Sequence, residues 1–208
     1  MFQRDYILRL IELFAKIVAR VLQLKENKEY DQALQEIGEA YRSLLGIPAH
    51  LVHSMWDFEL IDLLKSGEKC GIMAGLLKEE AEIYALQNKK SESILIYFKA
   101  LSLLLEAPEI QSEELDKILH SLENYETPAR LKRKLISYHE RSGNYSRAED
   151  LLFELADAPD SSIREFGISF YSRLKEKSSE DLQKGNLSPE EIVEGLSAFE
   201  RKLAHHDI

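Results

Sequence analysis

The chain has 208 residues, 44% of them hydrophobic and 31% charged, and its formal net charge at pH 7 is −10. This composition is typical of a folded protein and excludes a disordered one. The acidic balance argues against sequence-independent nucleic-acid binding, because each phosphate contact needs a cation, and the lone Cys70 excludes an intramolecular disulfide framework.

The first predicted element is a helix over residues 2–24, within MFQRDYILRLIELFAKIVARVLQL. Residues 1–24 carry a formal net charge of +2, which leaves a net charge of −12 for the rest of the chain. Charged residues interrupt the apolar stretch, which is unlike a signal peptide, and no apolar run reaches the ~18 residues of a membrane span. Together with the single free cysteine, these features predict a cytoplasmic protein.

This first helix carries two apolar stripes that are displaced around its axis. The first consists of Tyr6, Leu10, Leu13, Ile17, Val21 and Leu24. The second consists of Ile7, Ile11, Phe14, Val18 and Leu22. One neighbouring helix cannot cover both stripes, so we expect the second to pack on another helix of the chain or on a second subunit.

Helical periodicity continues along the chain, without a convincing alternating strand segment bounded by turn residues. Ser54 is a candidate cap for the third helix, and Gly67 is expected to break the pattern. We therefore predict an all-α fold of about 8–10 helices. Those after the first are expected over residues 30–45, 56–66, 71–87, 91–106, 112–125, 128–141, 145–156, 162–177 and 189–204.

A recurring sequence pattern marks three helical hairpins. A short polar turn precedes a small residue, Ala33, Ser93 or Ala148, and apolar residues then follow at helical spacing. This pattern resembles the tetratricopeptide repeat, in which a small residue early in the second helix lets it pack closely on the first. The spacings of 60 and 55 residues depart from the usual period of about 34, so the resemblance implies an irregular α–α superhelix of antiparallel hairpins with interposed helices.

A closer resemblance covers residues 1–107. The segments QRDYILRLIE, KEYDQAL, LLGIP and EEAEIYALQ are similar to a family of uncharacterised bacterial proteins with a tetratricopeptide-like fold and no assigned activity. This resemblance supplies a fold and no reaction. We expect one helical-repeat domain over residues 1–208, with a two-hairpin part at 1–107 and a C-terminal helical part at 108–208.

No group of residues predicts catalysis, a cofactor or a metal. His50 and His53 lie three residues apart without a third ligand of suitable spacing, and His205, His206 and Asp207 are expected to form a solvated tail. The carboxylates Glu79, Glu80 and Glu82 are expected on a solvated helix face. Phosphate-binding glycine loops, nucleophile elbows and zinc-type cysteine pairs are absent from the sequence.

The most informative polar cluster is PARLKRKLISYHER, in which Leu131, Leu135 and Tyr138 mark the buried stripe. Alignment with the repeat through Ala148 implies that the residues facing the concave groove include Arg130, Arg133, Ser137 and Arg141. These arginines would then meet a carboxylate or a phosphate group. The alternative is a solvated basic face paired with nearby carboxylates.

These observations favour a non-catalytic helical-repeat scaffold that binds a protein or a peptide. One partner that fits this expectation is a second copy of the chain, bound through the first helix. Two alternatives stay open. One is a peripheral membrane protein that lays its basic first helix on an anionic surface. The other is an enzyme whose scattered site leaves no motif.

Overall fold

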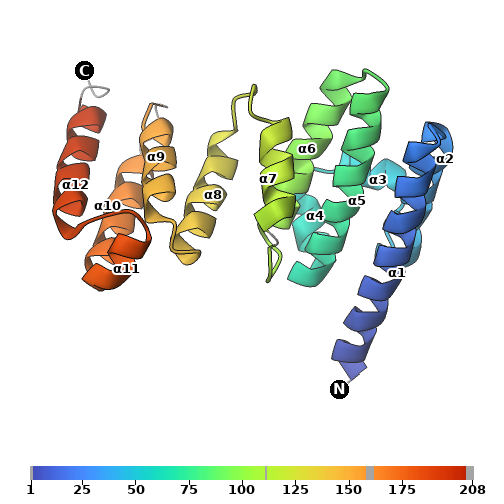
Figure 1. Cartoon of the computed structure of the whole chain (residues 1–208), viewed down its shortest axis with the longest axis horizontal. Coiled ribbons are helices and arrows are strands. Elements are labelled where there is room, and N and C mark those ends of the chain that lie inside the picture. Colours follow the sequence, from blue (N-terminus) through green and yellow to red (C-terminus); the bar gives the residue numbers. More distant parts are fainter. Residues whose placement is uncertain (1, 111, 158–161, 205–208) are drawn as a thin grey trace. The chain divides into compact units, whose positions relative to one another are not determined.

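The computed structural model describes residues 2–110, 112–157 and 162–204, with side chains from residue 5 onward. Within these ranges it contains twelve α-helices and no strand (Figure 1), which confirms the all-α prediction. The expected number of about 8–10 helices was too low, because short helices such as α3 and α11 were not counted. The helices are α1 (Phe2–Glu26), α2 (Tyr30–Leu45), α3 (Ala49–Ser54), α4 (Asp57–Leu64), α5 (Gly67–Leu86), α6 (Lys90–Leu104), α7 (Ser112–Ser121), α8 (Ala129–Arg141), α9 (Tyr145–Leu155), α10 (Ser162–Lys175), α11 (Ser179–Lys184) and α12 (Pro189–Ala204).

The chain divides into two compact units, Met1–Glu126 and Thr127–Ile208. In the first unit, α1 pairs with α2 and α5 pairs with α6. Helix α5 also packs against both α1 and α2, and α7 packs on α6. The short helices α3 and α4 follow the first hairpin; α3 contacts α2, and α4 contacts α5 and α6. Helix α5 is thus the central helix of this unit.

The three hairpins turn in the same way. Lys28, Asn88 and Gly143 each adopt a left-handed conformation, with φ of 62°, 60° and 74°. In each turn the next backbone N–H donates to the carbonyl five residues earlier, as in Glu29 to Leu24 at 2.8 Å. This closure is a Schellman motif, which satisfies carbonyls at the end of the first helix.

The small residue that follows each turn is buried. Ala33 and Ala148 are 0% exposed and Ser93 is 3% exposed. The Ser93 hydroxyl also donates to the Ala81 carbonyl of α5 at 2.8 Å, so the two helices approach closely at this point. The close packing predicted from the sequence pattern is therefore present in the structure.

Two expected helix starts were wrong, and one short helix of the second unit was not predicted. Ser54 ends α3 instead of capping the next helix, and α4 begins at Asp57, where the Glu59 carboxylate accepts the Trp56 N–H at 2.7 Å. Helix α5 begins at Gly67, because Ser66 serves as its N-cap. In the second unit, the stretch after α10 forms the unpredicted short helix α11, which Ser178 caps.

The second unit contains the hairpin of α8 and α9, with α10 and α12 packed against each other. Its core includes aromatic side chains: Phe170, Tyr171 and Phe199 are fully buried. Gly167 is required where α10 meets the Phe199 ring, since a Cβ there would lie 2.2 Å from a ring atom. This close contact positions α12 on α10.

Candidate functional site

A pocket with a volume of about 240 Å³ opens in the first unit between α3, α5 and α6, and we call it the α3–α6 pocket. Three of its seven lining side chains are aliphatic, and the others carry polar groups. The lining residues are His53 from α3, Leu77 and Tyr84 from α5, and Glu92, Leu95, Ile96 and Lys99 from α6.

A buried carboxylate fixes the histidine of the pocket. Glu80 is 3% exposed, and its Oε1 lies 2.8 Å from His53 Nε2. The Tyr41 hydroxyl, also buried, donates to the other oxygen of Glu80 at 2.6 Å. The hydrogen bond to Glu80 raises the pKa of His53, while burial and then the charge of Glu80 raise the pKa of Tyr41. The Glu80 carboxylate therefore fixes the orientation of the His53 imidazole through its Nε2 atom.

Lys99 holds the end of α3 against α6. Its Nζ donates to three backbone carbonyls, at 2.7 Å to Val52, 3.2 Å to His53 and 2.8 Å to Met55. These are carbonyls that the end of a helix leaves without intrahelical partners. Burial lowers the pKa of Lys99. All three N–H groups of the ammonium are used within the protein.

The rim of the pocket combines an aromatic ring, a carboxylate and an exposed leucine. The Lys89 ammonium lies 5.3 Å from the centre of the Tyr84 ring. Leu95 is 70% exposed. Glu92 is exposed as well, and within the described ranges its carboxylate has neither a hydrogen bond nor an ion pair.

The chemistry of this pocket suits binding. A histidine oriented by a carboxylate can exchange protons, but acyl transfer also needs a nucleophile and donors for an oxyanion. None of the lining residues is a serine, threonine or cysteine, and the Lys99 ammonium is already engaged. The arrangement therefore favours recognition of a ligand.

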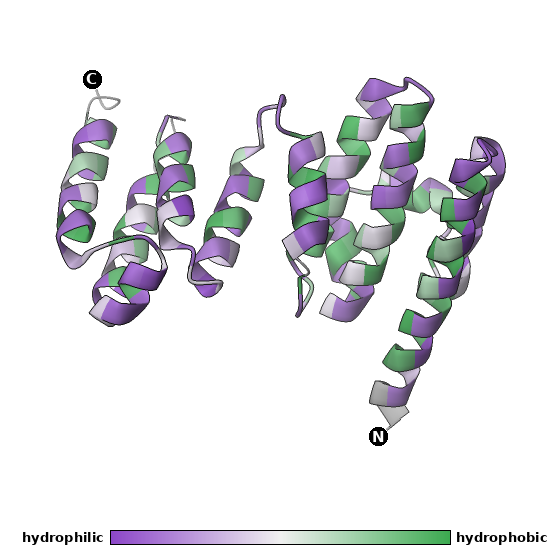
Figure 2. Ribbon diagram, in the orientation of Figure 1, coloured by the Kyte–Doolittle hydropathy of each residue, from purple (hydrophilic) through white to green (hydrophobic). Residues whose placement is uncertain are grey.

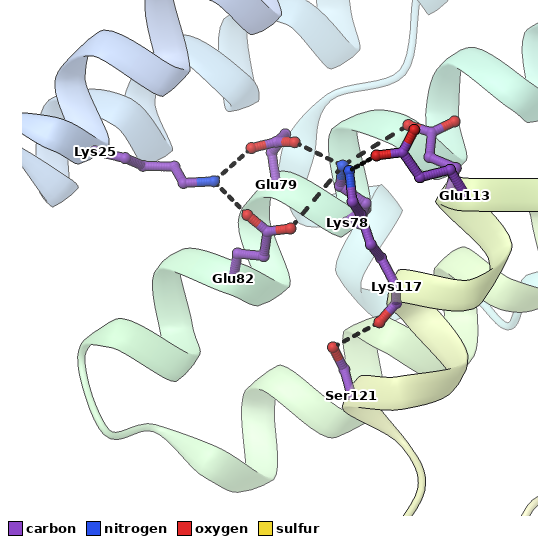
Figure 3. A network of polar contacts seen from close by, with 8 residues as sticks. Lys25, Lys78, Glu79, Glu82, Glu113, Lys117 and Ser121 are labelled. Carbon is purple, nitrogen blue, oxygen red and sulfur yellow. Dashed lines mark hydrogen bonds and ion pairs between the residues drawn. The ribbon is translucent and has the colours of Figure 1, made fainter.

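A network of ionic side chains joins α1, α5 and α7 elsewhere in the first unit (Figure 3). Lys25 Nζ bonds to Glu79 at 2.6 Å and to Glu82, while Lys78 Nζ lies 3.0 Å from Glu79 and 3.7 Å from Glu114. Burial lowers the pKa of Lys25, but its hydrogen bonds to the two glutamates outweigh this effect and the pKa is raised overall. The lysines neutralise carboxylates here instead of presenting free charges.

The expected solvated face of Glu79, Glu80 and Glu82 was wrong for its first two members, which are each 3% exposed. Neighbouring positions on a helix are about 100° apart, so the two carboxylates leave α5 in different directions. Glu79 meets α1, whereas Glu80 meets α2 and α3. Because α5 is surrounded by other helices, both directions lead into the protein.

The second neighbour that we expected for α1 is α5. Phe14 packs there against Gly75, where an added Cβ would lie 2.5 Å from the ring. Ile7 and Val18 are half-buried, while Ile11 and Leu22 remain 46% and 43% exposed. The second stripe is therefore only partly covered within the chain.

The uncovered part of α1 forms a strip, which we call the outer strip. Its members recur at alternating spacings of three and four residues. They are Leu8, Ile11, Ala15, Val18 and Leu22. Figure 2 shows hydrophobic residues along the length of α1, which is longer than α2, 25 residues against 16. Tyr6 and Leu13, each 48% exposed, lie on the opposite flank of the helix.

The predicted groove residues of α8 lie in the second unit, and part of the set has contacts there. The Arg133 guanidinium donates to the Ser162 hydroxyl at 2.6 Å and lies 5.2 Å from the centre of the Phe166 ring, both on α10. The Ser137 hydroxyl donates to the Arg133 carbonyl at 3.1 Å. Arg130 and Arg141 are exposed, and anion binding by this cluster stays a prediction.

Among the described residues, His50 and His53 do not share a site. His50 is exposed, and His53 faces Glu80. Among the residues with described positions, no three His, Cys, Asp or Glu side chains are placed to hold a metal ion. The tail at 205–207 lies outside the described residues. None of the described helices is long and apolar enough to cross a bilayer.

Sequence reasoning missed Glu80, Tyr41 and Lys99 as parts of a site. The only local signal was a pair of adjacent glutamates in an otherwise apolar helix, GIMAGLLKEEAEIYAL. Such a pair requires buried partners when the helix is covered on all sides. The partners themselves come from α2 and α3, far away in the sequence.

Neither the curated proteins nor the solved structures gave a match to this chain. One family model matches residues 1–204, which is nearly the whole sequence. With both units included in that match, the chain belongs to DUF6483, a family of unknown function.

Proposed function

We propose that this protein is a non-catalytic scaffold of tetratricopeptide-like hairpins that binds another protein through the outer strip of α1. The hairpin assignment draws support from three identical turns, each followed by a buried small residue. A binding role agrees with the pocket chemistry, which lacks a nucleophile among its lining residues.

The observation that carries the proposal is the spacing of the outer strip. Apolar residues at alternating intervals of three and four form the seam by which one helix packs along another. Charged residues such as Glu12 and Lys16 lie between this strip and the opposite flank of α1. A helix fits such a narrow seam better than a flat membrane surface does.

The partner that we propose is a second copy of the chain. Leu8 and Leu22 are equally distant from Ala15, so a two-fold axis at Ala15 pairs Leu8 of one copy with Leu22 of the other. The same patch then serves both subunits, as a two-fold interface requires. The small Ala15 side chain allows the two helices to approach closely at their crossing point.

The size of the strip predicts a reversible dimer. Leu8, Ile11 and Leu22 are 51%, 46% and 43% exposed. Fully burying one such side chain gains ~1.5–3 kcal/mol, so covering the exposed half gains about 1 kcal/mol. The three side chains of each of the two copies together contribute roughly 6 kcal/mol, and the ~4 kcal/mol or more that association costs removes most of this gain, so the dimer needs further contacts of the strip and its flanks. The dimer should therefore dissociate on dilution.

Sedimentation equilibrium over a wide concentration range tests this proposal. We expect a monomer–dimer equilibrium in the native chain and a monomer in the double variant Ile11→Glu, Leu22→Glu, with an unchanged far-UV circular dichroism spectrum. Val193→Glu is the matched control, because Val193 is 58% exposed on α12 of the second unit. A native chain that stays monomeric at about 1 mM, or equal dissociation by the control, overturns the proposal.

A further inference from the structure

We propose that the α3–α6 pocket binds an alkylammonium group, with the aliphatic chain among Leu77, Leu95 and Ile96 and the charged head at Glu92. This site is separate from the outer strip. In this pocket the hydrogen-bond donors already have partners within the protein, whereas two acceptors are available to a ligand.

The donors of the pocket are occupied. Lys99 gives its three N–H groups to backbone carbonyls of α3 and the residue after it. His53 faces Glu80 through Nε2. An anionic ligand would therefore have to take a lysine away from the end of α3, which makes an anion a poor occupant.

Two acceptors remain available. The Glu92 carboxylate has no hydrogen-bond or ion-pair partner in the ranges that the structure describes. When His53 is neutral and donates from Nε2 to Glu80, Nδ1 carries a lone pair, and no described group donates to it. A ligand that supplies several donors and a positive charge complements both groups.

The aromatic ring of the pocket is already in contact with a cation. The Lys89 ammonium lies 5.3 Å from the centre of the Tyr84 ring. A cation is attracted to such a ring face by its quadrupole. A bound alkylammonium therefore finds this face occupied and places its charged head at Glu92.

The walls define the rest of the ligand. Three aliphatic side chains and a volume of about 240 Å³ fit a short unbranched chain. The same chemistry occurs in a free primary amine and in the side chain of a lysine on a partner protein. The experiment has to distinguish these two sources.

The probes are n-pentylammonium, hexanoate and 1-pentanol, which carry the same five-carbon alkyl chain and differ in the charge of the head group. Binding is followed in the full chain through the methyl resonances of leucine and isoleucine. We expect saturable shifts at Leu77, Leu95 and Ile96 with n-pentylammonium, with a dissociation constant of about 1 mM. Stronger binding of hexanoate or 1-pentanol overturns the proposal.

Two variants locate the charged head. Glu92→Gln should weaken the binding of n-pentylammonium by up to about fivefold, the upper end of the range for an exposed ion pair. Glu109→Gln makes the same change at an exposed loop carboxylate outside the pocket and should leave binding unchanged. Equal affinity in Glu92→Gln and the native chain would exclude Glu92 as the head contact and overturn the proposal.

A blocked tripeptide with a central lysine separates the two sources. Tighter binding of the peptide than of n-pentylammonium indicates a partner's lysine, whereas tighter binding of the free amine indicates a small-molecule ligand. Either result supports alkylammonium recognition. Failure of both probes to shift the three wall residues refutes it, whatever the oligomeric state of the chain.

Acid should weaken this binding, which gives an independent readout. Protonation of His53 removes the Nδ1 acceptor and adds a positive charge, while the alkylammonium itself stays charged up to a pH of about 10. We expect affinity to fall as the pH drops through the pKa of His53, and the substitution His53→Gln to abolish this dependence. The charged and titratable groups around His53 are Glu80, Tyr41, Tyr84, Glu92 and Lys99.

Discussion

Replacing Lys25 by methionine tests how far the buried ionic network stabilises the first unit. Methionine keeps the length and the apolar stem of the side chain and removes its charge. Lys25 is 10% exposed in its side chain and bonds to Glu79, which is 4% exposed, at 2.6 Å. The substitution therefore leaves a buried carboxylate with one cation fewer.

The expected loss follows from what remains around Glu79. Breaking a buried ion pair costs ~3–5 kcal/mol when one charge is left without compensation. Here Lys78 stays 3.0 Å from Glu79, so part of the compensation survives. We expect Lys25→Met to lower the free energy of unfolding by about 2–3 kcal/mol, which corresponds to a fall in Tm of roughly 6–12 °C for a unit of this size.

Lys117→Met provides the control, because Lys117 pairs with Glu113 at 2.8 Å while both side chains are exposed, 57% and 81% (Figure 3). This variant should lose less than about 0.5 kcal/mol. Urea titration monitored by circular dichroism and by Trp56, the only tryptophan of the chain, measures both variants. Equal losses, or a loss below about 1 kcal/mol for Lys25→Met, would refute the burial argument.

Three further substitutions in the first unit have expected outcomes. Gly75→Ala should displace the Phe14 ring and lower the free energy of unfolding by about 1–3 kcal/mol in a urea titration, and unchanged stability would show that the ring moves freely. Tyr41→Phe should cost about 1–3 kcal/mol, because Glu80 loses a buried donor, and a neutral result would contradict that hydrogen bond. The pKa of His53 is raised above 6.5 by its hydrogen bond to Glu80, so its contribution to stability is full below pH 6.5 and is lost as pH rises through the raised pKa. Urea midpoints against pH should show this decline in the native chain and not in His53→Gln, and parallel profiles would refute it.

The hairpins could be predicted because their signals are local. A polar turn, a small residue five positions after the left-handed residue, and apolar residues at helical spacing all lie within one stretch of chain. Ala33, Ser93 and Ala148 were found in this way, and all are buried. The start of α12 at Pro189 agrees with the predicted range, and a local signal, the Ser188–Glu191 capping box, marks it.

The polar contacts of α5 could not be predicted in the same way. Periodicity tells which face of a helix is apolar, but α5 is buried nearly all round, so no face distinguishes Glu79 from Glu82. The partners of Glu80 lie on α2 and α3, and only the folded chain brings them together. Similarly, Lys99 showed nothing in the sequence to relate it to carbonyls of α3.

Gly67 shows that helix propensity alone does not predict where a helix begins. Glycine lowers helix propensity, which suggested a break, yet Ser66 caps α5 directly before it. A Cβ at position 67 would lie 2.7 Å from the Glu106 carbonyl oxygen. Tertiary contact with the end of the second hairpin therefore requires glycine there, and the local propensity is secondary.

The shared turn geometry has a consequence for how this architecture tolerates changes in length. Each turn is closed by hydrogen bonds across a fixed number of residues, so an insertion inside it would remove the left-handed residue from its place. The segment from α2 to α5 is longer and contains α3 and α4, although Gly46 also closes the end of α2 in a left-handed conformation. Engineered loops or tags should therefore be accepted between hairpins and rejected within them. Lys28 occupies the position that glycine fills in the third turn, so Lys28→Gly is a candidate stabilising change in a redesigned version of the chain.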